Sequence, residues 1–317
     1  MNEVAETSVP EQGAQWPTVE GKPKMLWWSG EFMNWDRGTL HISEVPWSAV
    51  SMVFEGIRGY WNENLRQLYL VDLDAHIRRL IQSMKIVRMY SKWEEDEIAR
   101  VVVELLRRNE LRRDVYVAPL GFFRVELPGP VPAAQMPGEI VLMTRNSFSV
   151  LGRRGTITAA VSSWKRISDD VMPPRVKAIP NYQNNRYVAD EITLNGYDYG
   201  IMLTREGKVA EAANAALFII RDGVASTPNV TSGVLESITR LRVLHLLKEE
   251  MGVPVMEREV DRTELYTCDE AFICGTGHEF KAITEIDRYP VGDGSAGPVA
   301  TKLEVLYHDI VRGKVPA

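Results

Sequence analysis

Residues 175–185 read RVKAIPNYQNN and place a lysine and a tyrosine five positions apart, between a loop and a predicted helix. Apolar residues stand on both sides of Lys177. A lysine in apolar surroundings loses solvation, so its pKa falls. A neutral amine near pH 7 attacks carbonyl groups and forms Schiff bases. The segment therefore indicates carbonyl chemistry at Lys177, with the phenol of Tyr182 beside it.

Other segments offer the groups that one carbonyl cofactor, pyridoxal phosphate, requires besides a lysine. Its pyridine nitrogen needs a carboxylate, its ring hydroxyl a hydrogen-bond donor and its phosphate several donors. Tyr182 is the candidate for the hydroxyl. Glu211, in VAEAANAALF, is the candidate for the nitrogen, because a carboxylate among apolar residues usually has a partner. Taken alone, Glu211 is better explained as a solvated residue at a strand edge.

Candidates for the phosphate donors lie in three separate segments. In TSGVLESITR, Ile238 and Thr239 fall in the first turn of a predicted helix, where free backbone N–H groups and the helix dipole attract anions. Thr276 stands between two glycines in CGTGHE, and Arg79 lies among the apolar residues of HIRRL. Every helix has free N–H groups in its first turn, so this feature alone does not predict a phosphate site. The prediction depends on the three segments together with Lys177, Tyr182 and Glu211.

The composition is that of a globular protein without nucleic-acid or membrane partners. The chain has 317 residues, 45% hydrophobic and 25% charged, and a net charge of −6. It lacks a basic block and an apolar run of about 18 residues. The N-terminus does not resemble a signal peptide, and Cys268 and Cys274 have neither metal-ligand nor CxxC spacing. We therefore expect a cytoplasmic protein with no metal site.

The hydrophobic patterns predict a mixed α/β (α+β) fold of two domains. Strands outnumber helices and do not alternate regularly with them, which disfavours a Rossmann fold. Helices are expected at 74–87, 92–111, 184–196, 236–252 and 298–313. A hairpin is expected in MLWWSGEFMNW, with Ser29 and Gly30 at its turn. The expected organisation is a flexible arm at 1–24, a small N-terminal α/β domain at 25–145, an interdomain loop at 146–156 and a large C-terminal cofactor-binding domain at 157–317.

Several motifs in order resemble the fold-type IV, class IV pyridoxal-phosphate enzymes, and most nearly the branched-chain-amino-acid aminotransferases. The motifs are WWSGEFMNWDRGTLHIS, VFEGIRGY, HIRRLIQSMKI, SSWKR with VKAIPNY, EAANAALF, LESITR and CGTGHE. The resemblance begins near residue 25 and covers about nine tenths of the chain. It implies a two-domain fold and a homodimer whose partner contributes to the pocket. Its substrates would be a small amino donor and a 2-oxo acid.

The resemblance also implies a role for each matched residue. Lys177 would form the Schiff base with pyridoxal phosphate and move the proton between the α-carbon and the cofactor. Glu211 would keep the pyridine nitrogen protonated, Tyr182 would bond the ring oxygen, and Leu235 would pack on the ring face. The phosphate would be bound by Arg79, Ile238, Thr239 and Thr276. The residues expected to bind substrate are Phe54, Tyr116, Arg124 and Gly277.

The chain departs from the family at the groups that usually hold the substrate carboxylate. Three family positions, two tyrosines and an arginine, align with Ala49, Val150 and Ala118. The carboxylate site is therefore absent or rebuilt, and the candidates for rebuilding it are Arg124, Arg153 and Arg154. Arg58 matches a family arginine and is expected to be structural or to support the site. Ala216 replaces a family asparagine near Glu211, which would loosen the setting of Glu211.

The sequence leaves three possible functions open. The first is an aminotransferase whose donor is a hydrophobic or branched-chain amino acid or an (R)-amine, with the cofactor cycling to its pyridoxamine form. The second is a lyase of the same fold, similar to aminodeoxychorismate lyases, which would release a small oxo acid without that form. The third is a non-catalytic protein with a decayed pocket. The intact set of Lys177, Tyr182, Glu211 and Thr239 argues against the third.

Overall fold

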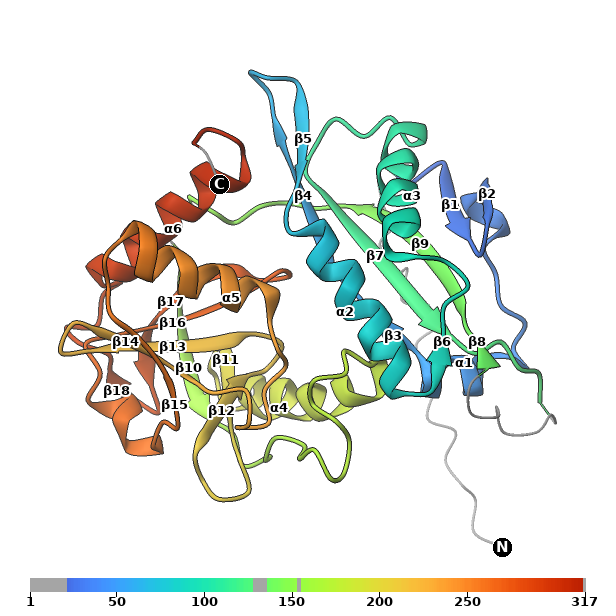
Figure 1. Ribbon diagram of the computed structural model, residues 1–317. Helices are drawn as coiled ribbons and strands as arrows, with labels where there is room; N and C mark the ends of the chain where they lie inside the picture. Colours follow the sequence, from blue (N-terminus) through green and yellow to red (C-terminus); the bar gives the residue numbers. More distant parts are fainter. Residues whose placement is uncertain (1–21, 128–135, 153–154, 316–317) are drawn as a thin grey trace, which may run out of the picture.

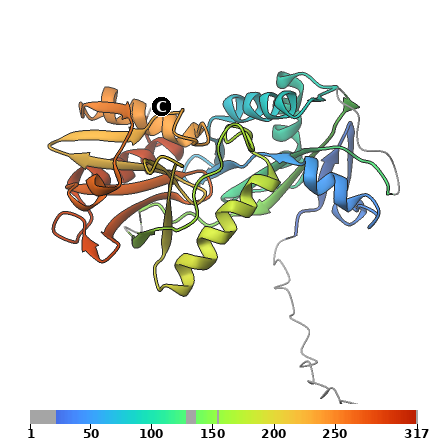
Figure 2. The same cartoon turned by 90° about the horizontal axis from the view of Figure 1, so that it is seen from below.

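The computed structural model describes residues 22–127, 136–152 and 155–315. Within these ranges the chain forms two large sheets that lie side by side, each with its own helices (Figure 1). Seen from below, they form two lobes that meet along a central junction (Figure 2). The mixed α/β fold predicted from the sequence is confirmed.

The first lobe contains the elements up to residue 146. They are β1 (Met25–Trp28), β2 (Glu31–Asn34), η1 (Trp35–Arg37), α1 (Val45–Ser51), β3 (Val53–Phe54), β4 (Ile57–Asn62), β5 (Gln67–Leu70), α2 (Leu73–Ile86), β6 (Met89–Tyr90), α3 (Glu95–Arg108), β7 (Val115–Phe122), β8 (Met136–Pro137) and β9 (Glu139–Asn146). The hairpin predicted around residues 29 and 30 is confirmed, because Ser29 and Gly30 both have positive φ, as a tight turn between β1 and β2 requires.

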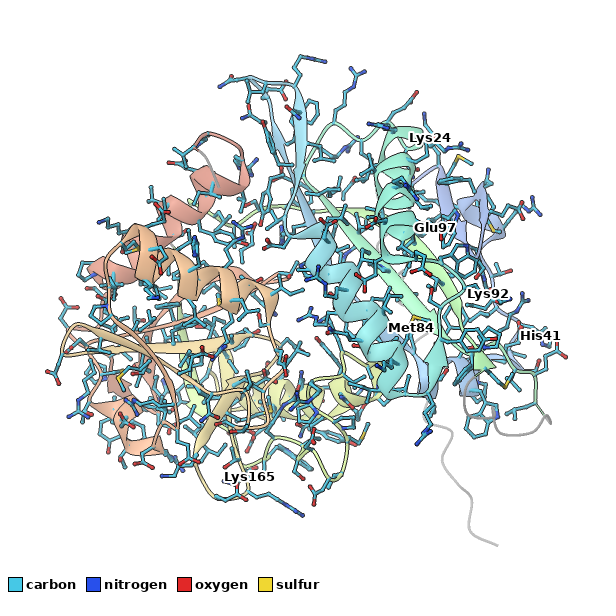
Figure 3. The ribbon with its side chains drawn as sticks, in the orientation of Figure 1. Lys24, His41, Met84, Lys92, Glu97 and Lys165 are labelled. Carbon is cyan, nitrogen blue, oxygen red and sulfur yellow. The ribbon has the colours of Figure 1, made fainter. Side chains whose placement is uncertain are left out.

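The first sheet has the strand order β2-β1-β9-β7-β4-β5, and β3 also pairs with β7. In β7, Val115 and Val117 are fully buried in the core that the sheet forms with α2 and α3. Successive side chains of a strand point to opposite faces, so Tyr116 and Ala118 lie on the other face of the sheet. Side chains are drawn in Figure 3, where Met84 marks the buried side of α2.

The termini of α3 illustrate how the local sequence selects the helix. Glu94 and Glu97 form a reciprocal capping box that satisfies backbone N–H groups at its start. The first turn is acidic, and the last turn contains Arg107 and Arg108, as the helix dipole prefers.

The second lobe contains the remaining elements. They are β10 (Thr156–Val161), η2 (Ile179–Asn181), α4 (Tyr182–Leu194), β11 (Tyr199–Leu203), β12 (Val209–Ala212), β13 (Ala216–Arg221), β14 (Val224–Pro228), α5 (Ile238–His245), η3 (Leu246–Glu250), β15 (Val255–Arg258), η4 (Arg262–Tyr266), β16 (Glu270–Gly275), β17 (Glu279–Ile286), β18 (Tyr289–Pro290) and α6 (Pro298–Val311). The helices expected near these positions are present, although the one expected over 236–252 continues after α5 as the π-helix η3.

The second sheet has the strand order β12-β11-β10-β17-β16-β13-β14-β15, with β18 paired to β17. It mixes parallel and antiparallel pairs, which excludes a regular Rossmann sheet. Helices α5 and α6 pack on one side of it, and α4 packs against β11. In the described part of the chain, no helix is both long and apolar enough to cross a membrane.

The two lobes are joined by contacts that cross the junction. Tyr60 of β4 is buried in the core of the second lobe, and its hydroxyl donates to Glu279 over 2.8 Å. The backbone N–H of Phe54, in β3, donates to the carbonyl of Lys177 over 2.8 Å. The segment that contains Lys177 is therefore attached to the first lobe, and it leads into η2 and α4 of the second.

The strands of the two sheets divide between residues 146 and 156. Whether the four segments expected from the sequence are independent folding units stays a prediction, and most of the expected N-terminal arm lies outside the described residues.

Candidate active site

A cavity of about 210 Å³ surrounds Lys177 at the junction of the two lobes. We call it the lysine cavity. Its lining combines charged, aromatic and small side chains from both lobes. The lining residues include Phe54, Gly56, Arg79, Tyr116, Arg166, Lys177, Tyr182, Asn185, Glu211, Asn214, Leu235, Ser237, Thr276, Gly277 and His278.

The amine of Lys177 lies against two aromatic rings. Its Nζ donates to the Tyr182 hydroxyl over 2.6 Å and lies 4.5 Å from the centre of the Phe54 ring. Burial, and secondly the positive charge of Arg79, lower the pKa of Lys177. Burial raises the pKa of Tyr182, so its phenol keeps its proton. The pair therefore presents a reactive amine next to a hydrogen-bond donor.

The start of α5 lies near one end of the lysine cavity. Ser237 caps the helix, since its hydroxyl accepts from the N–H of Arg240 over 3.2 Å. Ile238 and Thr239 occupy the first two helical positions, whose N–H groups have no partner within the helix. Arg79 reaches the same helix start from α2, because its Nη1 donates to the carbonyl of Glu236 over 2.8 Å. This arrangement gathers donors for an anion.

A fully buried carboxylate, Glu55, holds Arg79 in place. Arg79 Nε and Nη2 donate to its two oxygens over 2.6 and 2.9 Å, and His76 Nδ1 lies 2.7 Å from Oε2. Glu55 is 0% exposed and Arg79 is 9% exposed. Arg79 and His76 together outweigh the effect of burial, so the pKa of Glu55 lies well below its ordinary value. A guanidinium has five N–H groups, so the bonds to Glu55 and Glu236 leave two for a ligand.

The carboxylate of Glu211 enters the cavity between two donors. Arg166 Nη2 lies 2.9 Å from Oε1, and the N–H of Leu235 donates to Oε2 over 3.0 Å. Arg166 is itself held by Asn185 Oδ1 at 3.1 Å. Burial raises the pKa of Glu211, whereas Arg166 and the Leu235 N–H act in the opposite direction. A cation bound in the cavity would further favour the ionised carboxylate.

Arg58 supports the loop at the end of β16. Its Nε and Nη2 donate to the carbonyls of Thr276 and Gly277 over 2.7 and 2.9 Å, and its Nη1 lies 3.3 Å from Glu279. These contacts agree with the supporting role expected from the sequence. The Thr276 hydroxyl lies 3.4 Å from that of Thr239, so the loop and the start of α5 face each other.

A second, larger cavity of about 650 Å³ shares Phe54 and Tyr116 with the first. We call it the apolar cavity. It lies on the face of the first sheet that α2 and α3 leave uncovered, and its lining is mainly apolar. The lining residues are Lys22, Pro23, Trp35, Phe54, Glu55, Tyr116, Ala118, Met143, Thr144 and Arg145.

The structure brings most of the expected site residues together. The lysine cavity is lined by Lys177, Tyr182, Arg79, Glu211, Leu235, Thr276, Gly277, Phe54 and Tyr116. Ile238 and Thr239 are buried at the start of α5, next to this lining. Whether these residues have the roles implied by the resemblance stays a prediction.

Arg124 is not brought to the site. It forms an ion pair with Glu44, which is almost fully buried, and it lines neither cavity. The Glu44 carboxylate compensates the charge of Arg124, so there is no longer a reason to expect that Arg124 contacts the substrate. The other two arginines proposed for that contact, Arg153 and Arg154, lie outside the described residues.

Sequence reasoning did not identify several residues of the two cavities. Glu55 and His278 stand inside the motifs VFEG and CGTGHE, and Arg166 ends SSWKR. Burial lowers the pKa of His278 to about 4, so a neutral imidazole borders the lysine cavity. Arg145 lies in no motif that could have identified it. It comes to lie opposite Tyr116 only through the pairing of β7 with β9.

A family model described as amino-transferase class IV matches residues 52–286. The chain belongs to the class IV aminotransferases. It is 38% identical to a probable branched-chain-amino-acid aminotransferase of Aquifex aeolicus over 263 residues, which are 83% of this chain and 84% of that protein. It is 31% identical to the branched-chain-amino-acid aminotransferase of Escherichia coli K12 over 296 residues, 92% of this chain and 94% of the other.

Solved structures agree with this assignment to the class IV aminotransferases. The pyridoxal-phosphate form of branched-chain amino acid aminotransferase from Thermobaculum terrenum superimposes with a TM-score of 0.89 at 41% identity, covering 93% of this chain and 96% of that one. The protein is therefore a pyridoxal-phosphate-dependent transaminase of fold type IV. These matches favour neither the lyase nor the non-catalytic alternative.

The residues of this class IV aminotransferase fit the cofactor. The unpaired N–H groups at the start of α5 and the free N–H groups of Arg79 suit a phosphate. The Glu211 carboxylate faces the cavity with both of its oxygens fixed, as a protonated ring nitrogen requires. Gly277 has no atom near the position of a Cβ, which leaves space beside the cavity.

Proposed function

We propose that the chain transfers the amino group of a branched-chain amino acid to a 2-oxo acid, with Lys177 as its catalytic residue. The observation that carries the substrate class is the apolar cavity, which shares Phe54 and Tyr116 with the lysine cavity. Trp35, Ala118 and Met143 suit an aliphatic side chain there. The names of the relatives from Aquifex aeolicus and Escherichia coli support the same class.

Each polar residue of the lysine cavity has a distinct role in this proposal. Pyridoxal phosphate, when bound, supplies the carbonyl that accepts the amino group and a ring that withdraws electrons from the α-carbon. The amine of Lys177, whose pKa is lowered by burial and by the charge of Arg79, takes the proton from the substrate α-carbon and returns it. Tyr182 keeps its proton, because burial raises its pKa. Its hydroxyl oxygen accepts from Lys177 Nζ, and its O–H would donate to the ring oxygen of the cofactor.

The remaining groups hold the cofactor at its two ends. Glu211 stabilises a positive charge on the ring nitrogen of the cofactor, and Arg166 keeps the Glu211 carboxylate oriented. Arg79, with Ile238, Thr239 and Thr276, binds the phosphate. Leu235 borders the ring between these ends.

Glu211→Gln is expected to keep the cofactor bound but to lower turnover by about 10²-fold or more, because a neutral amide no longer stabilises the charge on the ring nitrogen. Visible absorption of the purified variant measures cofactor content, and single-turnover kinetics measure the rate. An unchanged single-turnover rate at full cofactor content would remove Glu211 from this role.

The substrate class is tested with a panel of donors added to the holoenzyme. Both enantiomers of leucine, isoleucine and valine are compared with an (R)-amine that has no carboxylate, and the visible absorption of the cofactor is followed without an acceptor. We expect a branched-chain amino acid to change the absorption at least ten times faster than the amine. A faster reaction with the amine would contradict the proposed donor.

We further propose that the protein works as a homodimer in the cytoplasm. The resemblance to the family supports the dimer. Cys268 and Cys274 are both buried and unpaired, and burial raises the pKa of each thiol to about 12. Such unreactive, reduced thiols suit a reducing compartment.

A further inference from the structure

Five cations line the two cavities in the described part of the chain, and one of them lacks both a carboxylate partner and a role. Three pair with carboxylates: Arg79 with Glu55, Arg166 with Glu211, and Lys22 with Asp36. Lys177 bonds Tyr182 and is the proposed catalytic amine. Arg145 forms no ion pair with any described residue and is exposed. Its guanidinium is therefore available to a ligand.

The pairing of two strands sets Arg145 against Tyr116, a residue that lines both cavities. Arg145 of β9 lies directly opposite Tyr116 of β7, on the sheet face that borders the apolar cavity. Its guanidinium lies 4.4 Å from the centre of the Tyr116 ring, a cation–π contact. Tyr116 also lines the lysine cavity. Burial raises the pKa of its phenol, whereas the charges of Lys177 and Arg145 act in the opposite direction. Tyr116 therefore contacts the free guanidinium and borders the same cavity as the Lys177 amine.

An amino acid with an aliphatic side chain needs a cation at this place. Its carboxylate would otherwise be buried among apolar walls without a partner, which is costly. The planar fork of an arginine binds a carboxylate through two parallel hydrogen bonds. Position 118, where the family arginine would stand, holds alanine, and Arg124 is bound to Glu44. Ala118 and Met143 have small or flexible side chains next to Tyr116 and Arg145, which leaves room for a ligand.

We propose that Arg145 binds the α-carboxylate that the amino donor and the 2-oxo acid acceptor have in common. Arg145 thus determines that the substrate is an amino acid, not a simple amine. This proposal rests on the proposed function, because it assumes that the donor reacts at Lys177.

The test compares ligands with and without a carboxylate on the holoenzyme and on the Arg145→Met variant, which keeps an unbranched, flexible side chain but removes the guanidinium. The donors are leucine and 3-methylbutylamine. The non-reacting ligands are 4-methylpentanoate and its amide, and calorimetry measures their binding directly. We expect the variant to weaken binding of 4-methylpentanoate and to raise the KM of leucine by about 10- to 100-fold, because charge-assisted hydrogen bonds are lost. Binding of the amide and the kcat with 3-methylbutylamine should change less than about threefold.

Two further variants separate a binding role from a structural one. Arg145→Lys should recover part of the affinity for 4-methylpentanoate, because it restores the charge without the fork. Arg100→Met, on the exposed side of α3, should behave like the wild-type enzyme. Equal losses for the acid and the amide, or unchanged affinity for the acid, would overturn the proposal.

Failure of the proposed function gives a different result. If the wild-type enzyme binds 4-methylpentanoate through Arg145 but reacts with no branched-chain donor, the carboxylate site stands and the donor class is wrong. If the wild-type enzyme transaminates leucine and the Arg145→Met variant keeps the KM of leucine, the donor class stands and the role of Arg145 is wrong.

Discussion

Replacement of Lys177 by alanine is expected to abolish turnover and leave the fold intact. The Lys177 amine is the proposed nucleophile of the lysine cavity and the group proposed to move the proton at the substrate α-carbon. Loss of both functions should lower the rate by about 10⁴-fold or more. The backbone contacts of the segment with β3 do not involve the side chain, so circular dichroism should be unchanged. Initial rates with a branched-chain donor measure the loss.

A second measurement does not depend on turnover. After borohydride treatment of the holoenzyme, mass spectrometry should find the cofactor covalently attached to Lys177 in the wild-type protein and absent from the variant. Lys92→Ala is the control, because Lys92 is exposed on the first lobe, outside both cavities (Figure 3). It should keep both activity and attachment. Wild-type turnover in the Lys177→Ala variant would refute the assignment of the active site.

The second large effect is expected for Glu55→Gln, which leaves Arg79 buried without its carboxylate. The carboxylate makes three short contacts, with Arg79 and His76. Removal of one partner from such a buried group costs about 3–5 kcal/mol, because a charge remains uncompensated. We expect the urea midpoint of the apoprotein to fall accordingly, and the affinity for pyridoxal phosphate to fall because Arg79 is no longer fixed at the start of α5.

The control for Glu55→Gln is Glu104→Gln, which breaks the exposed ion pair with Arg108 on α3. An exposed pair is worth at most about 1 kcal/mol, so this midpoint should hardly move. Equal midpoints for the wild-type protein and Glu55→Gln would show that Glu55 is not needed to compensate Arg79.

The stability difference between the wild-type protein and Glu55→Gln should also depend on pH in a defined direction. The folded-state pKa of Glu55 is lowered below its unfolded value. Its stabilisation is therefore fully present above the ordinary glutamate pKa of about 4.3 and is lost as the pH falls toward the folded-state pKa. The difference should be constant between pH 6 and 8 and shrink below about pH 4.3. Urea titrations across this range measure it.

The sequence alone was sufficient for the parts of the fold and site that depend on local order. Apolar residues at helical spacing predicted α2 and α3, and the serine–glycine turn predicted the first hairpin. The lysine and the tyrosine are five residues apart across a loop-to-helix junction, so their contact is local. The apolar neighbours of Lys177 indicated the direction of its pKa shift, to which the distant Arg79 also contributes.

Only the tertiary structure decided which distant charges compensate one another. Glu55 pairs with Arg79, 24 positions away, and Glu211 pairs with Arg166, whereas Arg124 is bound by Glu44. A charged residue in the sequence has many possible partners, and its availability depends on which of them the folded chain brings within a few ångströms. The register of β7 on β9 likewise sets Arg145 against Tyr116. The sequence predicted carbonyl chemistry at Lys177, and the folded structure showed which cation of the two cavities has no carboxylate partner among the described residues.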